Sequence, residues 1–244
     1  MVELKKYDFH FFEKDLEELN IILDERKLCQ FMSYYELLVE WNQVMNLTAI
    51  TDFHEICKKH FVDSLSLVKA CEVSSFSSVI DIGTGAGFPG IPLKIVFPDL
   101  KITLLDSLQK RVHFLQTIVE TLSLEKVEVI HGRAEDFAKD QKYREQFDLS
   151  VSRAVANLST LSEYCIPFVK PGGYFISYKS EKFVEEMDHA QKAFSVLGGR
   201  LERQVEFTIP DSNLYRNLLV IYKEKETPAA YPRRAGIPSK KPIH

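Results

Sequence analysis

The stretch VIDIGTGAGFPGIPLKI, residues 79–95, decides the fold because it joins a short β-branched run to a glycine-rich turn and an apolar segment. Glycines in such a turn let the chain bend tightly and let a ligand approach the backbone. Pro89 and Pro92 suit the first turn of a helix, where a missing N–H costs little. The stretch therefore predicts the first strand–turn–helix unit of an open α/β sheet, which binds ligands at the carboxyl ends of its strands.

The chain downstream repeats this alternation of strand and helix. Helix-like segments such as 110–122 and 182–199 lie between short apolar runs, which predicts a mostly parallel sheet with helices on both faces. The last two runs are separated only by residues 210–216, too few for a helical crossover, so we expect an antiparallel pair at a sheet edge. Seven strands are predicted, at 79–82, 102–106, 127–131, 147–152, 174–179, 205–209 and 217–222.

Two further segments flank this predicted α/β, Rossmann-like domain of residues 76–225. Residues 1–75 predict an N-terminal helical extension, because apolar side chains such as Leu16 and Leu19 recur at steps of three and four. Residues 226–244 are rich in proline and basic side chains and poor in apolar periodicity. This composition predicts a disordered or surface-draped tail.

Composition excludes several classes of protein. With 244 residues, 45% hydrophobic and 27% charged, the chain is typical of a globular protein. No run approaches the roughly 20 apolar residues of a membrane span, so we expect a cytoplasmic protein without a membrane partner. The four cysteines are widely spaced, which predicts no zinc or other metal site. Because the net charge is −4, an RNA partner would need a local basic patch.

The glycine loop matches the patterns of two different cofactors. From Gly85 it spells G-A-G-F-P-G, a dinucleotide pattern, and Asp106 follows at about the 20-residue spacing of a ribose-binding acid. From Asp81 it spells D-I-G-T-G-A-G, a pattern associated with S-adenosylmethionine. An acidic group inside the strand end suits a cationic ligand better than a diphosphate, which favours S-adenosylmethionine. A nicotinamide cofactor and a ligand-free turn remain alternatives.

Each acidic or glycine position has a role if the ligand is S-adenosylmethionine. Asp81 would hold its cationic end, directly or through water. Gly83, Gly85 and Gly87 would let the backbone close on the methionine portion and the ribose. Asp106 would accept both ribose hydroxyls.

Several motifs in register resemble one known family. The segments DIGTGAGFPG, LLDS, GRAEDF, SRAVANLSTL and KPGG resemble the class I S-adenosylmethionine-dependent methyltransferases. WNQVMNLTAI, HFVDSL and YPRRAGIPSKKPI narrow the match to the ribosomal small subunit methyltransferase G family, also called glucose-inhibited division protein B. The resemblance covers about residues 34–242. It implies cofactor contacts from Gly83, Phe88, Ala134, Glu135 and Arg153.

Two of these residues have plain structural alternatives. Phe88 could be a core residue that caps the helix after the loop. Arg153 could be an ion-pair partner of Asp136 or Asp148.

The resemblance also implies a reaction, the methylation of N7 of one guanine in the decoding-region loop of 16S rRNA. Guanine N7 has an in-plane lone pair and no proton to lose, so direct in-line displacement at the sulfonium methyl needs positioning and no general base. The chain accordingly has no Asn/Asp-Pro-Pro-aromatic motif and no Pro-Cys nucleophile. Asp63 is a candidate for stabilising the cationic 7-methylguanosine product, and its alternative role is to cap the helix that follows.

Local basic clusters are the candidate contacts to the implied partner, 16S rRNA in the small ribosomal subunit. A solubilising tail is the alternative for the C-terminal cluster, and we expect a monomer. Rival functions are a small-molecule methyltransferase, a nicotinamide-dependent oxidoreductase and an RNA-binding module that uses the cofactor only as a ligand. The candidate RNA contacts are Lys58, Lys59, His60, Arg233, Arg234, Lys240 and Lys241.

Overall fold

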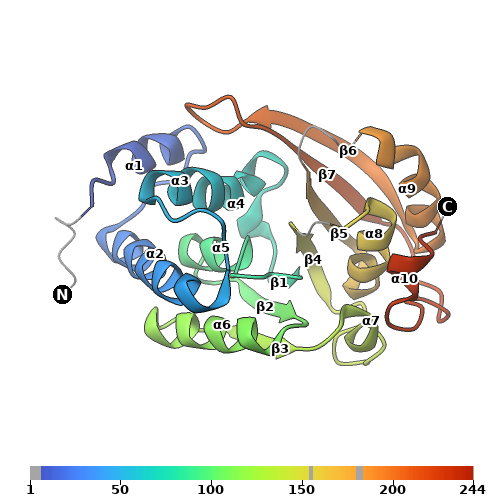
Figure 1. Cartoon of the computed structure of the whole chain (residues 1–244). Helices are drawn as coiled ribbons and strands as arrows, with labels where there is room; N and C mark the ends of the chain where they lie inside the picture. The colour runs from blue at the N-terminus through green and yellow to red at the C-terminus, as the bar shows by residue number, and fades with distance from the viewer. Residues whose placement is uncertain (1–6, 154–155, 180–183, 244) are drawn as a thin grey trace.

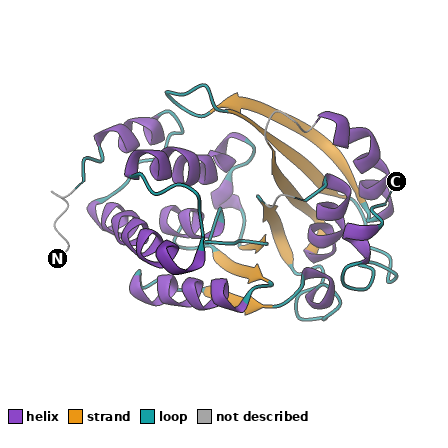
Figure 2. Ribbon diagram, in the orientation of Figure 1, coloured by secondary structure: helices purple, strands orange, loops and turns teal. Residues whose placement is uncertain are grey.

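The computed structural model describes residues 7–153, 156–179 and 184–243, and its centre is a seven-stranded sheet (Figures 1 and 2). The strands lie in the order β3-β2-β1-β4-β5-β7-β6. Only β7 runs antiparallel to its neighbours, β5 and β6. This confirms the predicted fold class. The strands are β1 (Ser78–Ile82), β2 (Lys101–Asp106), β3 (Val127–His131), β4 (Phe147–Ser152), β5 (Val169–Lys179), β6 (Gly199–Thr208) and β7 (Tyr215–Lys223).

The expected antiparallel pair at the sheet edge is present, but its first strand is longer than the sequence predicts. The predicted strand spans 205–209, whereas β6 begins at Gly199. β6 pairs with β7 alone, and most of its side chains are exposed or half-buried. An edge strand therefore needs no apolar run, and the first half of β6 carries Arg200, Glu202, Arg203 and Gln204.

Helices of the N-terminal half cover one face of the sheet (Figure 1). Asp24 begins the longest of them by accepting a hydrogen bond from the Lys27 N–H, and left-handed Asn46 ends it. Trp41 of this helix packs against Phe114 across the layer. The elements on this face are α1 (His10–Glu17), α2 (Glu25–Met45), α3 (Phe53–Ile56), the π-helix η2 (Cys57–Val62), α4 (Asp63–Leu65), the 3₁₀ turns η3 (Ser66–Lys69) and η4 (Val73–Ser75), α5 (Gly90–Val96) and α6 (Gln109–Thr121).

The opposite face carries the remaining helices and a second apolar cluster (Figure 1). Among all the described residues, no helix combines the length and the hydropathy needed to cross a membrane. The elements on this face are α7 (Ala134–Phe137), α8 (Leu158–Cys165), η5 (Ile166–Phe168), α9 (Val184–Val196) and α10 (Ile237–Lys240).

Residues 226–243 follow a defined course with most side chains exposed or half-buried, so of the two alternatives predicted for the tail, disorder is wrong and a surface-draped segment is present. Pro232, Pro238 and Ile243 are buried, and Ile243 belongs to the second apolar cluster. The segment contains the short helix α10, which packs on α8. Composition misleads here because the segment is held mainly by polar contacts to the rest of the chain.

Candidate functional site

The carboxyl group of Asp81 fixes the glycine loop after β1 by hydrogen bonds. Its Oδ2 accepts hydrogen bonds from Thr84 Oγ1 at 2.7 Å and from the Gly90 N–H at 2.8 Å. Gly90 itself has no room for a side chain, because an added Cβ would lie 2.3 Å from Leu104 Cδ2. The first carboxylate of the motif thus closes the loop onto the start of α5.

Asp81 is fully buried, and burial raises its pKa to about 7. Its second oxygen, Oδ1, has no hydrogen-bond partner among the described residues. The pocket described below is lined by neighbouring residues and not by Asp81. Asp81 therefore bonds to the loop and does not line the pocket, and its predicted contact with a cationic ligand remains a prediction.

The loop backbone has positive φ angles, which favour glycine, at three alternate positions. Gly83, Gly85 and Gly87 have φ values of 69°, 63° and 100°. A Cβ at Gly87 would also lie 2.8 Å from the hydroxyl oxygen of Tyr34. The buried Tyr34 hydroxyl donates to the Ala86 carbonyl at 2.5 Å, so helix α2 holds the loop from the other side. The sequence shows Tyr34 only as one member of an apolar stripe, with no signal for this contact.

A pocket opens where β1, β2 and β3 end, and it brings together residues that the sequence predicts for the cofactor. Gly83, Asp106, Ala134 and Glu135 all line it. Helix α8 contributes Leu161 and Tyr164 to the same pocket, which its sequence does not reveal because its apolar spacing is that of any core helix. Within the described residues, no group of three or more His, Cys, Asp or Glu side chains is arranged to hold a metal ion. The other lining residues are Ile82, Leu105, Ser107, Gly132, Arg133 and Ala156.

Two carboxylates of this pocket are fixed by backbone N–H groups. Asp106 accepts from the Gly85 N–H through Oδ2 and from the Leu108 N–H through Oδ1, each at 2.9 Å. Glu135 accepts from the Gly236 N–H at 2.9 Å. Both side chains are buried, so their remaining lone pairs face little solvent. A ligand with hydroxyl or amino donors would complete them.

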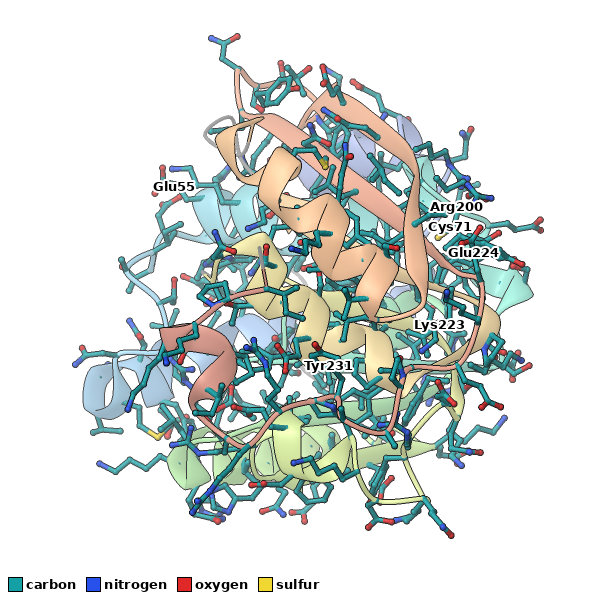
Figure 3. The ribbon with its side chains drawn as sticks, turned by 90° about the vertical axis from the view of Figure 1, so that its right-hand side faces the viewer. Glu55, Cys71, Arg200, Lys223, Glu224 and Tyr231 are labelled. Atoms are coloured by element: carbon teal, nitrogen blue, oxygen red, sulfur yellow. The ribbon has the colours of Figure 1, made fainter. Side chains whose placement is uncertain are left out.

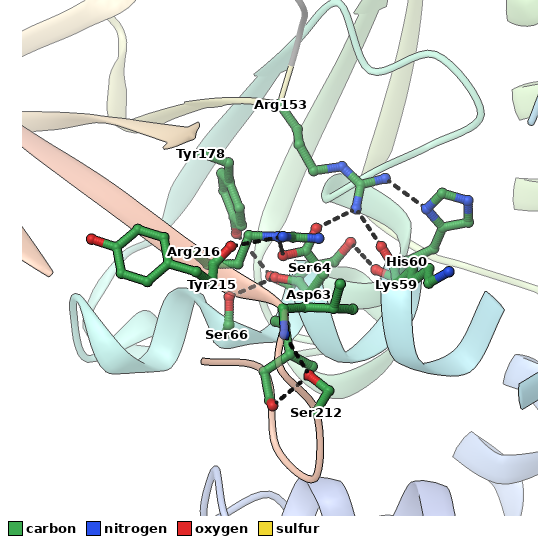
Figure 4. Close-up of polar contacts among 12 residues, drawn as sticks. Lys59, His60, Asp63, Ser64, Ser66, Arg153, Tyr178, Ser212, Tyr215 and Arg216 are labelled. Atoms are coloured by element: carbon green, nitrogen blue, oxygen red, sulfur yellow. Dashed lines mark hydrogen bonds and ion pairs between the residues drawn. The ribbon is translucent and has the colours of Figure 1, made fainter. Parts of the chain in front are cut away.

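Beyond the glycine loop, Arg153 is the centre of a polar cluster (Figure 4). Its Nη1 donates to Asp63 Oδ2 at 2.9 Å, and Arg216 Nε donates to the other oxygen of Asp63 at 2.8 Å. The alternative partners proposed for Arg153 are wrong, since Asp63 binds it and Asp148 instead pairs with Lys170. Asp63 thus lies between two guanidinium groups.

The proposed capping role of Asp63 is also wrong. Asp63 has helical backbone angles, and α4 continues directly from the π-helix η2 with Val62 as its preceding residue. Since the helical path is unbroken, no free N–H group needs a side-chain cap there. The Asp63 side chain is only 5% exposed, and its charge is balanced by Arg153 and Arg216.

His60 and Phe88 complete this cluster. The two rings are stacked with centroids 4.7 Å apart, and the Arg153 guanidinium lies 4.9 Å from the Phe88 centroid. His60 Nδ1 lies 3.3 Å from Arg153 Nη2, and Nε2 lies 2.9 Å from Thr48 Oγ1. Burial and then the charge of Arg153 lower the pKa of His60 to about 3, so the ring is neutral and accepts from Arg153. Phe88 is 6% exposed and belongs to the core, as its structural alternative predicts.

The candidate RNA contacts Lys58 and Lys59 on η2 differ in how accessible their amino groups are to solvent. Lys58 Nζ bonds to Asp15 and to the Pro210 carbonyl, so it ties α1 to the loop between β6 and β7. Lys59 is partly exposed and pairs with Glu55 at 2.6 Å. Lys58 therefore has a structural role, whereas Lys59 remains accessible to solvent.

The candidate contacts in the tail lie on the other face of the sheet from η2 (Figure 1). Arg233 is bound to Glu163, which is completely buried. Arg234, Lys240 and Lys241 are exposed. Of the motif SRAV, Ala154 and Val155 lie outside the described residues.

Comparison with known proteins matches nearly the whole chain. The family model for rRNA small subunit methyltransferase G covers residues 27–215. The ribosomal RNA small subunit methyltransferase G of Lachnoclostridium phytofermentans is 50% identical, over 95% of this chain and 96% of its own. The protein of the same name from Alkaliphilus metalliredigens is 52% identical, over 93% and 95%.

Solved structures share the fold at low identity. A protein of Klebsiella pneumoniae assigned as an O-methyltransferase superposes with a TM-score of 0.56 at 12% identity, over 87% of this chain and 96% of its own. A protein of Pyrococcus horikoshii assigned as a transferase gives 0.52 at 13% identity, over 66% and 64%. The sheet and its flanking helices are thus a Rossmann-like architecture found in distant proteins.

Proposed function

Since the chain belongs to the rRNA small subunit methyltransferase G family, it is an S-adenosylmethionine-dependent methyltransferase of 16S rRNA that acts on guanine N7, and we propose that the pocket at the ends of β1, β2 and β3 holds its methyl donor. We infer that it works in the cytoplasm, where small ribosomal subunits are found.

This proposal rests on one observation, that the same pocket is lined by Gly83, Asp106 and Glu135. Each follows or ends a different strand, and the three strands are neighbours in the sheet. Asp106, fixed by two backbone N–H groups, is suited to accept hydrogen bonds from ribose hydroxyls. Glu135, beside the small side chain of Ala134, is suited to accept from the amino group of adenine. The glycine loop between them leaves its backbone open to the methionine portion.

The cofactor supplies a methyl group on a cationic sulfur, which the lone pair of guanine N7 displaces in line. No residue has to remove a proton, so the contribution of the chain is to orient the two reactants. Arg153 stands at the end of β4 next to the glycine loop and is held there by Asp63, His60 and the face of Phe88. We propose that Asp63 is a positioning residue for Arg153. Its carboxylate already has two cationic partners and is not free to contact the methylated base.

Exposed cations of the tail are the best candidates for RNA contact. Arg234, Lys240 and Lys241 are exposed on one short segment, as phosphate-binding side chains must be. Lys59 offers a further, partly exposed cation beside the Arg153 cluster. Lys58 and Arg233 are bound within the protein, and we propose that they act on structure.

The test is methyl transfer from labelled S-adenosylmethionine to small subunits that lack the modification, with the product mapped by mass spectrometry. We expect label on N7 of a single guanine. Transfer to small molecules alone would contradict the assignment. For the pocket, Glu135→Gln should weaken cofactor binding measured by calorimetry, whereas Asp136→Asn, which changes the exposed neighbouring carboxylate, should leave it unchanged. Equal affinities for both variants would contradict the proposed site.

A further inference from the structure

The C-terminal segment, residues 226–243, is first fixed just after β7. The Thr227 N–H donates to Glu145 Oε1 at 2.7 Å, and the Thr227 hydroxyl donates to the Leu197 carbonyl at 2.7 Å. Arg144 donates from its guanidinium to the carbonyls of Thr227 at 2.6 Å and Tyr231 at 2.8 Å. Figure 3 views this face, with Lys223 and Tyr231 marking the course of the chain. The segment therefore leaves the sheet along a defined path.

Its central anchor is the ion pair of Arg233 with Glu163 of α8. Arg233 Nη2 donates to Glu163 Oε2 at 2.6 Å, Nε donates to Oε1 at 2.9 Å, and the Arg233 N–H donates to the same Oε1 at 2.7 Å. Glu163 is fully buried. A carboxylate in that position is stable only with its partner, so the pair strongly favours the docked segment.

The third anchor reaches the cofactor pocket. The Gly236 N–H donates to Glu135 Oε1 at 2.9 Å, and the Thr160 hydroxyl donates to the Pro238 carbonyl at 3.1 Å. Thr160 precedes Leu161 on α8, and Leu161 and Glu135 both line the pocket. The C-terminal segment thus fixes one oxygen of a pocket carboxylate and packs against the helix that supplies another wall.

From these contacts we infer that the C-terminal segment is part of the cofactor site, with Arg233 as a positioning residue that acts on bound S-adenosylmethionine through Gly236 and Glu135. The inference rests on the proposed cofactor pocket and adds a second role to a segment proposed to touch RNA. Docked by Arg233, the segment holds the Glu135 carboxylate in one orientation before the cofactor arrives. Undocked, it leaves a mobile carboxylate that the cofactor has to order at a cost in affinity.

The same segment presents Arg234, Lys240 and Lys241 to solvent. Contacts with RNA that hold the segment in place therefore also hold Glu135, and coupling between two binding sites is reciprocal. Cofactor and RNA should each raise the affinity for the other.

The main test is a double-mutant cycle read by calorimetry with S-adenosylmethionine. Glu163→Gln combined with Arg233→Gln removes both charges and keeps an acceptor for the Arg233 N–H, which avoids an unpaired buried charge. We expect the dissociation constant to rise about three- to tenfold, the effect of one weakened hydrogen bond. In a Glu135→Ala background the same pair of changes should have no further effect. A merely structural role of the anchor would lower the affinity equally in both backgrounds, and this result would overturn the inference.

A second variant tests the same inference in case the double variant does not fold. Thr160→Val removes the hydroxyl that binds the Pro238 carbonyl and keeps the shape of the side chain, and it should weaken cofactor binding in the same direction. Arg234→Gln is the matched control, because it changes the exposed neighbouring cation. It should leave cofactor affinity unchanged and weaken transfer to small subunits. Unchanged cofactor affinity in Thr160→Val and in the double variant would overturn the inference. Unchanged transfer in Arg234→Gln would count only against the proposed RNA contact.

Discussion

Replacing Asp63 with asparagine removes the anionic group that bonds to both Arg153 and Arg216. The two guanidinium groups bond to opposite oxygens of this carboxylate at 2.9 and 2.8 Å, and their side chains are 19% and 21% exposed. Removing one partner of a buried ion pair typically costs 3–5 kcal/mol. Since water reaches about a fifth of each arginine, we expect the lower limit, about 3 kcal/mol of unfolding free energy. For a chain of this length the melting temperature should fall by roughly 6–12 °C.

Arg153 should also lose its fixed position, so the variant should bind S-adenosylmethionine more weakly. Urea denaturation measures the first effect and calorimetry the second. Glu55→Gln is the control, since Glu55 forms an exposed pair with Lys59 on the same helical segment and should change stability by less than about 1 kcal/mol. If Asp63→Asn were as stable as Glu55→Gln and bound the cofactor normally, the argument that Asp63 positions Arg153 would be refuted.

Three further predictions follow from the loop and the ring beside it. The folded pKa of His60, about 3, lies below its usual 6.5, so His60 contributes stability above pH 6.5 that is lost as pH falls toward 3. His60→Gln should therefore flatten the decline of unfolding free energy between pH 6.5 and 4, and an unchanged slope would contradict the neutral ring. A cation bound near Asp81 would lower its pKa from about 7. Calorimetry at pH 7 in two buffers should then detect proton release on S-adenosylmethionine binding, and equal release by Asp81→Asn would exclude this carboxyl as the source. Gly87→Ala should destabilise the fold by roughly 2–4 kcal/mol, since its Cβ meets Tyr34 at a positive φ. Gly85→Ala also places a side chain at a positive φ but has space for the added Cβ, so it should lower the unfolding free energy by about 1 kcal/mol. Similar urea midpoints for the two variants would refute the packing argument.

The sheet and the pocket were predictable because their signals are local. Short β-branched runs end at Ile82, Asp106 and His131, and parallel strands bring their carboxyl ends to one edge. Gly83 and Glu135 follow such ends, and both line the pocket.

The polar anchors were not predictable, because each joins residues far apart in the chain. Arg153 lies 90 residues from Asp63, and Arg216 lies 153 residues from it. Arg233 is 70 residues from Glu163. An arginine at one position carries no sign of which distant carboxylate it will meet. For this reason the ion-pair alternatives proposed for Arg153, the capping alternative for Asp63 and the disordered alternative for the tail were wrong.

The placement of β7 between β5 and β6 has a consequence for synthesis of the chain on the ribosome. β6 pairs with β7 alone, so residues 199–208 cannot join the sheet until residues 215–223 have been made. The anchor at Arg233 comes later still, within the last dozen residues of the 244. A nascent chain therefore has its glycine loop early but an incomplete sheet edge and an unanchored C-terminal segment until Arg233 has been made. A chain that stops a few residues before Arg233 would contain all seven strands of the described sheet and lack the ion pair that holds the C-terminal segment on α8.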